Sequence, residues 1–257
     1  MELAAYHQFV DLEEDHFWFR GRRAIFFALL DKEFHGRQDL EILEVGCGAG
    51  GLLKRLSAYG NAKGLELWPE LCKLAMDRSG QSMICGNAYA IPLADESQDL
   101  VCLFDTIEHI PDQEKALAEI RRVLKPGGMA FFSVPAYQFL FSNNDRVAHH
   151  CRRYTKGRLA KVCKQAGFEP KKISYFNSFL FPLILPAVLL GKFKQRWIGL
   201  KDPNKTNLSK TFPAPINATF ATIMGSERHL LRHMSFPVGH SLIGMFRRPP
   251  VNPSSDE

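Results

Sequence analysis

The sequence lacks the patterns that mark secreted, disulfide-rich proteins. Its six cysteines form no C-x-x-C pair, and most of them lie in apolar surroundings. We therefore expect buried free thiols in a reducing compartment. The amino-terminal stretch has neither the basic segment nor the apolar segment of a signal peptide, so we expect none there. These absences predict a cytoplasmic protein.

The sequence also lacks an apolar run long enough to cross a membrane. The run Ser178–Leu190 has 13 residues and contains Pro182 and Pro186, whereas a transmembrane helix needs about 20 apolar residues. Three cations and Trp197 follow the run, and such a combination can lie in a membrane interface. Residues 178–197 thus indicate peripheral contact with the inner face of a membrane. The alternative is a buried helix that lines a substrate pocket, and the shortness of the run favours it.

Acidic residues are scarce in the middle of the chain. From Arg146 to Lys210 only Glu169 and Asp202 stand against 15 lysines and arginines, an excess of 13 positive charges in a chain of net charge +6. This excess indicates an anionic partner such as a phosphorylated substrate, an acidic membrane surface or RNA, with a solvated basic face as the alternative. Nucleic acid is the less favoured partner, because no nucleic-acid-binding motif accompanies the basic stretch.

The main pattern in the sequence is an alternation of predicted strands and helices. Apolar strands separated by helical patterns are predicted at 40–45, 62–67, 82–85, 100–104 and 129–134. This order predicts an α/β protein with a parallel sheet and helices on both of its faces. At 257 residues the chain can hold one such domain with insertions.

A glycine-rich segment follows the first strand. Ile42–Gly51 reads Ile-Leu-Glu-Val-Gly-Cys-Gly-Ala-Gly-Gly. Glycines there can take positive φ and let a ligand approach the backbone, and free N–H groups open the next helix. The segment satisfies both G-x-G-x-x-G, the dinucleotide pattern, and E-x-G-x-G-x-G. The spacing alone therefore leaves NAD and S-adenosylmethionine open.

An acidic residue ends the second predicted strand. Glu66 lies 20 residues after Gly46, the distance that one strand-helix-strand unit requires. Its carboxylate can accept two hydrogen bonds from ribose hydroxyls. Both candidate cofactors carry that ribose, so Glu66 supports either.

Five motifs in fixed order decide between the two cofactors. E-V-G-C-G-A-G, G-L-E-L, G-N-A, D-L-V-C-L-F-D-T-I-E-H-I and L-K-P-G-G cover about residues 40–135. Together they resemble class I S-adenosylmethionine-dependent methyltransferases. The resemblance implies S-adenosylmethionine as cofactor and a Rossmann-like seven-stranded sheet whose last strand is antiparallel. Strands six and seven are predicted at 168–175 and 241–246, with a helical insertion at about 176–238 between them.

The resemblance also implies cofactor-binding residues. The glycines would hold the methionine and ribose part, the acidic residue and its neighbour the ribose, and Asn87 with Ala88 the adenine. Asp105 would face the donor's amino group, and an amino-terminal lid over 1–36 would close with an aromatic and an arginine. The predicted set is Glu44, Gly46, Gly48, Gly50, Glu66, Leu67, Asn87, Ala88, Asp105, Trp18 and Arg23.

Methyl transfer from a sulfonium is a direct displacement, so a base is needed only where the acceptor must lose a proton. His109, near the end of strand four, is the first candidate for that base, and His149 and His150 are the second choices. The surrounding stretch is similar to ubiquinone-biosynthesis O-methyltransferases, where residues matching Asp105, Glu108 and His109 are associated with a divalent metal. The same Glu-His pair occurs in relatives without metal, and we predict none here.

Arg152, Arg153 and Tyr154 are the predicted substrate residues, because arginine can clamp phosphate or carboxylate. A salt-bridged helix start is the alternative. We predict O-methylation of a small, partly apolar or lipid- or glycan-linked anionic substrate. An RNA methyltransferase and a non-catalytic donor-binding partner subunit are the rival hypotheses. The predicted methyltransferase domain spans 37–248, with a disordered tail at 249–257.

Overall fold

The computed structural model describes residues 10, 12–198 and 212–250. Part of the predicted lid over 1–36, and most of the predicted tail at 249–257, lie outside these residues. The chain forms two compact units. The first unit consists of residues 1–35, 134–155 and 174–242, and the second of 36–133, 156–173 and 243–257. The domain boundaries inferred from sequence stay a prediction.

A seven-stranded sheet runs in the order β3-β2-β1-β4-β5-β7-β6. Its first four pairings, β1 with β2, β1 with β4, β2 with β3 and β4 with β5, are parallel. The strands are β1 (Leu40–Val45), β2 (Gly60–Glu66), β3 (Ser82–Cys85), β4 (Gln98–Phe104), β5 (Leu124–Pro135), β6 (Glu169–Phe176) and β7 (Ser241–Arg247). The Rossmann-like fold predicted from sequence is confirmed.

Strand β7 lies antiparallel beside β5. Near one end of the pair, the N–H of Gly127 donates to the carbonyl of Arg248 over 2.8 Å. Near the other end, the N–H of Ala136 donates to the carbonyl of His240 over 3.1 Å. The bonded residue beside β7 falls from 248 to 240 as the residue in or beside β5 rises from 127 to 136. Opposite directions of numbering are the register of an antiparallel pair. The predicted orientation of the last strand is confirmed.

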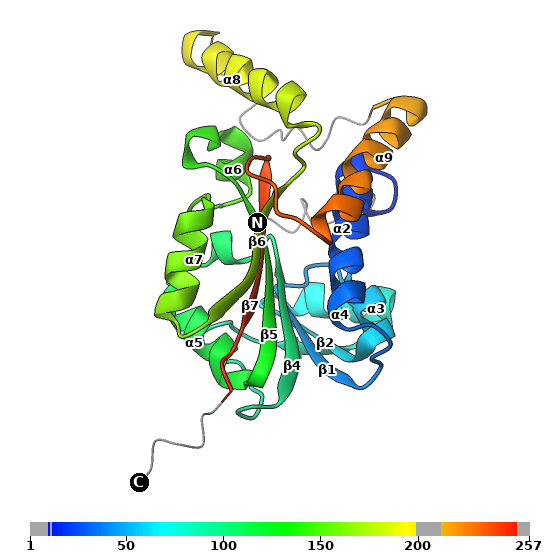
Figure 1. Cartoon of the computed structure of the whole chain (residues 1–257), viewed down its shortest axis with the longest axis vertical. Helices are drawn as coiled ribbons and strands as arrows, with labels where there is room; N and C mark the ends of the chain where they lie inside the picture. Colours follow the sequence, from blue (N-terminus) through cyan, green and yellow to red (C-terminus); the bar gives the residue numbers. More distant parts are fainter. Residues whose placement is uncertain (1–9, 11, 199–211, 251–257) are drawn as a thin grey trace. The chain divides into compact units, whose positions relative to one another are not determined.

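Helices cover both faces of the sheet within the second unit. Two of them, α3 (Leu53–Leu56) and α4 (Pro69–Ser79), connect β1, β2 and β3 on one face, and α5 (Gln113–Val123) and α7 (Lys156–Gln165) lie on the other (Figure 1). Right-handed crossovers place helices on opposite faces where the strand order reverses, here between β1 and β4. That reversal marks the edge of the sheet where ligands bind in such folds.

Three longer helices belong to the first unit: α2 (Phe17–Glu33), α8 (Phe181–Ile198) and α9 (Ala214–Leu231). The first and last of these pack against each other, because Gly21 leaves room for the side chain of Met224. A Cβ at Gly21 would come within 2.7 Å of the Met224 side chain. The shorter helix α6 (Asn143–Val147) and the 3₁₀ turn η3 (Gln138–Leu140) follow β5.

The apolar run is not the fully buried helix of the pocket-lining alternative favoured from sequence, although Leu180 and Phe181 at its start are buried. Helix α8 exposes Leu183 to 63%, Leu190 to 62% and Phe193 to 61%. A short apolar run is buried only where another element of the protein packs over it, and the run itself does not encode such an element. None of the helices among the residues that the structure describes is both long and apolar enough to cross a bilayer.

Candidate active site

The glycine loop after β1 has a backbone that only glycine adopts easily. Gly46, Gly48 and Gly50 have φ of 68°, 56° and 76°. A Cβ on Gly46 would also lie 2.4 Å from Cγ2 of Thr106, so no other residue fits there. The N–H of Gly46 donates to the carbonyl of Leu65 over 2.7 Å. The loop is thereby fixed to the end of β2.

Glu66 at the end of β2 reaches into this loop. Its Oε2 accepts a hydrogen bond from the N–H of Gly48 over 3.0 Å, and its Oε1 accepts one from the N–H of Leu67 over 2.8 Å. The residue is buried. A carboxylate offers about four acceptor positions, so two backbone bonds leave room for two ribose hydroxyls. The geometry fits a ribose-bearing cofactor.

Apolar surface and an ordered turn flank Glu66. Leu67 and Trp68 are exposed to 55% and 51%, although they follow a buried strand. On the other side, Oδ1 of Asn87 accepts a hydrogen bond from the N–H of Tyr89 over 2.9 Å and forms an Asx turn. The neighbouring Ala88 is half-buried. Sequence reasoning missed Trp68, which stands two residues after Glu66 and whose exposed ring suits contact with a planar base.

The turn after β4 borders the same loop. Asp105 is a non-glycine residue with φ 54°, and its N–H donates to the carbonyl of Ser133 over 2.9 Å. Its neighbour Thr106 is the residue that excludes a side chain at Gly46. Residues in this conformation persist only where the surroundings hold them, and they gather at functional sites. The structure therefore brings Asp105, the glycine loop and β2 together.

Two further sequence candidates follow in the 3₁₀ turn η2 (Ile107–His109). Glu108 is fully buried and His109 is half-buried. Their ligand atoms lie within 4.8 Å of each other, and Asp105 does not belong to that group. Glu44 on β1 is buried as well. The roles of these residues in proton transfer, cofactor binding or metal binding stay predictions.

The predicted lid residues make contacts inside the first unit. Trp18 stacks on Phe176 with 6.1 Å between ring centroids, and its ring meets His240 edge-on at 6.1 Å. Arg23 pairs with Glu14 over 3.3 Å. These contacts fix both side chains without the cofactor. Their predicted place over the cofactor stays a prediction.

Two of the predicted substrate residues point into the protein. Nε and Nη2 of Arg153 donate to the two oxygens of Asp145 over 2.7 and 3.0 Å, and His150 Nδ1 lies 2.9 Å from Oδ1. Burial raises the pKa of Asp145, but the hydrogen bonds from His150 and Arg153 outweigh it and hold the pKa well below its usual range. Tyr154 is fully buried. These side chains therefore support the chain after β5, whereas Arg152 is half-buried and His149 is exposed.

A second group of buried polar atoms surrounds the chain after β6. His240 Nδ1, both amide atoms of Asn177 and Oε2 of Glu227 have no hydrogen-bond partner among the described residues. The three residues adjoin, because the N–H of His240 donates to Asn177 O over 3.4 Å and the N–H of Ser178 to Glu227 Oε1 over 2.6 Å. Burial and the Arg153 charge lower the pKa of His240 to about 4, so its ring is neutral at pH 7.

Sequence reasoning did not select this second group. His240 stands before β7 in the segment Phe-Pro-Val-Gly-His-Ser-Leu, whose pattern assigns no role to the histidine. Glu227 and Asn177 carry no local signal, because their burial depends on packing between distant parts of the chain. Such unpartnered buried groups are uncommon in proteins and mark places where a ligand or water completes the bonding.

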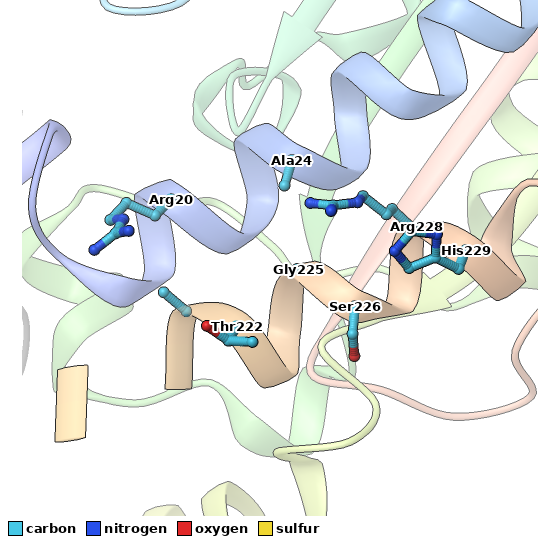
Figure 2. Close-up of a pocket in the computed structure, with 8 residues that line it drawn as sticks. Arg20, Ala24, Thr222, Gly225, Ser226, Arg228 and His229 are labelled. Carbon is cyan, nitrogen blue, oxygen red and sulfur yellow. The ribbon is translucent and has the colours of Figure 1, made fainter. Parts of the chain in front are cut away.

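A shallow groove of about 320 Å³ runs between α2 and α9 (Figure 2). Arg20, Arg228 and His229 line it beside the small residues Ala24 and Gly225. None of the predicted cofactor, catalytic or substrate residues lines it, although Arg20 and Ala24 belong to the predicted lid over 1–36. Its cations could attract an anionic group, but all three are exposed, and exposed cations hold anions weakly.

Comparison with known proteins identifies the family. The family described as a methyltransferase domain matches residues 43–132, which include the glycine loop, Glu66 and the turn after β4. A relative from Mycolicibacterium smegmatis, named as a probable S-adenosylmethionine-dependent methyltransferase, is 29% identical over 170 residues and covers 62% of each chain. The chain belongs to the S-adenosylmethionine-dependent methyltransferases.

One further relative agrees with this membership, and one solved structure agrees with the fold. The ubiquinone biosynthesis O-methyltransferase of Thiobacillus denitrificans is 26% identical over 155 residues, which cover 52% of this methyltransferase and 66% of the relative. The structure of an S-adenosylmethionine-dependent methyltransferase from Thermotoga maritima matches with a TM-score of 0.57 and 19% identity, and covers 95% of this chain and 99% of that one. S-adenosylmethionine is accordingly the cofactor of this methyltransferase.

Proposed function

We propose that this methyltransferase methylates an oxygen atom of a small, partly apolar acceptor that carries an anionic group, such as a lipid-linked or glycan precursor. The observation that carries the proposal is the position of His109. It stands on the turn whose Thr106 contacts the glycine loop at Gly46. An imidazole beside the cofactor loop can accept the proton that a hydroxyl loses when it is methylated.

The donor side of this proposal uses the second unit alone. Gly46, Gly48 and Gly50 form a loop that admits the methionine and ribose part closely, and Glu66 accepts hydrogen bonds from the ribose hydroxyls. Trp68 contacts the adenine. S-adenosylmethionine, when bound, supplies an electrophilic methyl group. The protein contributes alignment and exclusion of water.

The acceptor class is inferred from charge and from one relative. The excess of positive charge between residues 146 and 210 favours an anionic acceptor. Apolar side chains exposed on α8 in the same stretch favour one with an apolar part. The Thiobacillus denitrificans relative is named for O-methylation in ubiquinone biosynthesis, which supports a hydroxyl acceptor.

The donor half of the proposal is tested by calorimetry with S-adenosylmethionine on the wild type and on Glu66→Gln. We expect the substitution to weaken binding about tenfold or more, because a charged acceptor is lost from the ribose. Glu70→Gln, on the exposed first turn of α4, is the matched control and should bind normally. Equal affinity in all three proteins would contradict the role of Glu66.

The acceptor half is tested by methyl-label transfer to fractionated cell lipids and glycan precursors. Wild type should label an acid-stable methyl ether in a fraction that binds to anion exchanger. His109→Gln should lower kcat at least a hundredfold, because the proposed proton acceptor is lost. Label on nitrogen or carbon, or a His109→Gln enzyme with an unchanged kcat, would overturn the proposal. Binding without label in any fraction would favour a partner subunit.

A further inference from the structure

The outward face of α8 is apolar along most of its length. Leu183, Pro186, Ala187, Leu190 and Phe193 follow the spacing i, i+3, i+4, i+7, i+10, so they form one stripe along the helix. All five are exposed. A soluble helix normally presents polar residues on its outward face, and contiguous exposed apolar patches mark interaction surfaces. We call this stripe the α8 face.

Contacts on the opposite side fix this orientation. Ile184, Leu185 and Val188 are half-buried, so the helix already uses a different face toward the protein. Lys192 also holds the helix, because its Nζ donates to the carbonyl of Phe139 over 2.6 Å. Rotation that would bury the α8 face would break this bond and expose the inner face.

Two exposed aromatics extend the apolar surface. Phe139 and Phe179 are 56% and 45% exposed. Tyr137 connects Phe139 to the start of α8, because its ring lies 5.4 Å from Phe139 and 5.9 Å from Phe181. Through Tyr137, the apolar side chains of α8 and those of the turn η3 are connected within the first unit.

The charge around the α8 face identifies its partner. No acidic residue occurs between Glu169 and Asp202, whereas six lysines and arginines do. Lys194 is exposed at the end of the stripe. A second copy would place the same cations face to face in a symmetric dimer, which is unfavourable. The sequence of α8 contains Lys192, Lys194 and Arg196 and no acidic residue. An apolar face on such a helix complements a surface with an apolar interior and negative headgroups.

We propose that the α8 face docks on an anionic phospholipid membrane, with Leu183, Leu190 and Phe193 inserted below the headgroups and Lys194 at their level. The helix lies in the interface and does not cross it. This inference goes beyond methyl transfer, because it concerns where the enzyme works, and its test needs neither cofactor nor acceptor.

Sedimentation of the full chain with vesicles tests the proposal. Vesicles of phosphatidylcholine with about 30% phosphatidylglycerol should bind the wild type at least tenfold more strongly than pure phosphatidylcholine vesicles. Leu190→Glu should lower binding to the anionic vesicles about tenfold or more, because it removes buried apolar area and adds a charge. Leu230→Glu, on α9 with Leu230 45% exposed, is the matched control and should bind like the wild type.

Three measurements keep the test independent of folding and of the proposed function. Leu190→Glu should retain the wild-type melting temperature and its affinity for S-adenosylmethionine, since Leu190 is exposed and belongs to the first unit. Absence of vesicle binding by the wild type would overturn the proposal. So would equal loss in Leu190→Glu and Leu230→Glu. A wild-type dimer in sedimentation velocity that Leu190→Glu dissociates, without vesicle binding, would show that a second copy occupies the face.

Discussion

At the residue scale, Asp145 is the buried charge that holds the chain after β5. Asp145→Asn leaves the guanidinium of Arg153 buried without its carboxylate, and losing one partner of a buried pair costs about 3–5 kcal/mol. We expect the free energy of unfolding, measured by urea titration at pH 7, to fall by about 3 kcal/mol. Asp77→Asn removes the exposed pair with Lys73 and should change it by less than about 1 kcal/mol.

The pH dependence of this difference follows from the lowered pKa of Asp145. A carboxyl with a lowered folded pKa stabilises the protein fully above its unfolded pKa of 3.8, and the contribution is lost as the pH falls below that value. The gap between wild type and Asp145→Asn should therefore be constant from pH 7 to pH 5. It should shrink at pH 3.5. A gap that grows on acidification would refute the assigned ion pair.

His240 makes a second prediction at this scale. Its pKa is lowered from 6.5 to about 4 by burial and by the Arg153 charge, with the Asp145 carboxylate opposing them. The unfolded chain therefore binds a proton between these values that the folded protein does not, so stability falls as the pH drops from 6.5 to 4, by up to about 1.4 kcal/mol per pH unit. His240→Gln should remove this slope. Proton NMR titration of the wild type should show one imidazole, absent from His240→Gln, that titrates below pH 5.

At the element scale, the glycine loop is held by steric exclusion as well as by backbone conformation. Gly46→Ala would force φ 68° on an alanine and press its Cβ against Thr106. We expect a loss of about 2–4 kcal/mol in the free energy of unfolding. Affinity for S-adenosylmethionine by calorimetry should fall at least tenfold.

Two variants separate the causes of that loss. Gly36 has φ 73°, and a Cβ at this position would have no neighbouring atom within 4 Å. Gly36→Ala therefore measures the conformational cost alone, about 1 kcal/mol. Gly46→Ala combined with Thr106→Ser removes the clashing methyl group and should recover part of the loss. If Gly46→Ala proves no more harmful than Gly36→Ala, the steric account is wrong.

The elements that the sequence predicts well are those with local signals. Helix α4 begins at Pro69 and ends at Ser79, and Gly80 with φ 70° follows it, as proline and glycine preferences require. The helix after the glycine loop is short, because α3 covers only Leu53–Leu56 before a 3₁₀ turn. The L-K-P-G-G segment belongs to β5, whose pairing with β4 is a non-local interaction.

At the scale of the whole molecule, the order of segments in the sequence does not indicate which of them pack together. The amino-terminal 35 residues belong to the same compact unit as residues 174–242, and the Gly21–Met224 contact joins them. No periodicity within either segment encodes that partnership. For the same reason, the donor residues could be inferred from motifs with fixed spacing, whereas the buried group around Asn177 and His240 could not. The motifs reflect local geometry, whereas the burial of a residue depends on how the whole chain folds.

Charge asymmetry leads to the last prediction, because RNA is the rival partner for the basic stretch between residues 146 and 210. Binding to single-stranded RNA depends on counterion release. With about three phosphate contacts it should weaken about 30-fold between 0.1 and 0.5 M NaCl. Docking through the α8 face includes apolar insertion, which salt does not screen, so binding to anionic vesicles should weaken less than tenfold over the same range. Fluorescence anisotropy with a 20-nucleotide RNA and vesicle sedimentation measure the two slopes on the same protein. Micromolar RNA binding that survives 0.5 M NaCl, combined with vesicle binding that does not, would reverse the assignment of the partner.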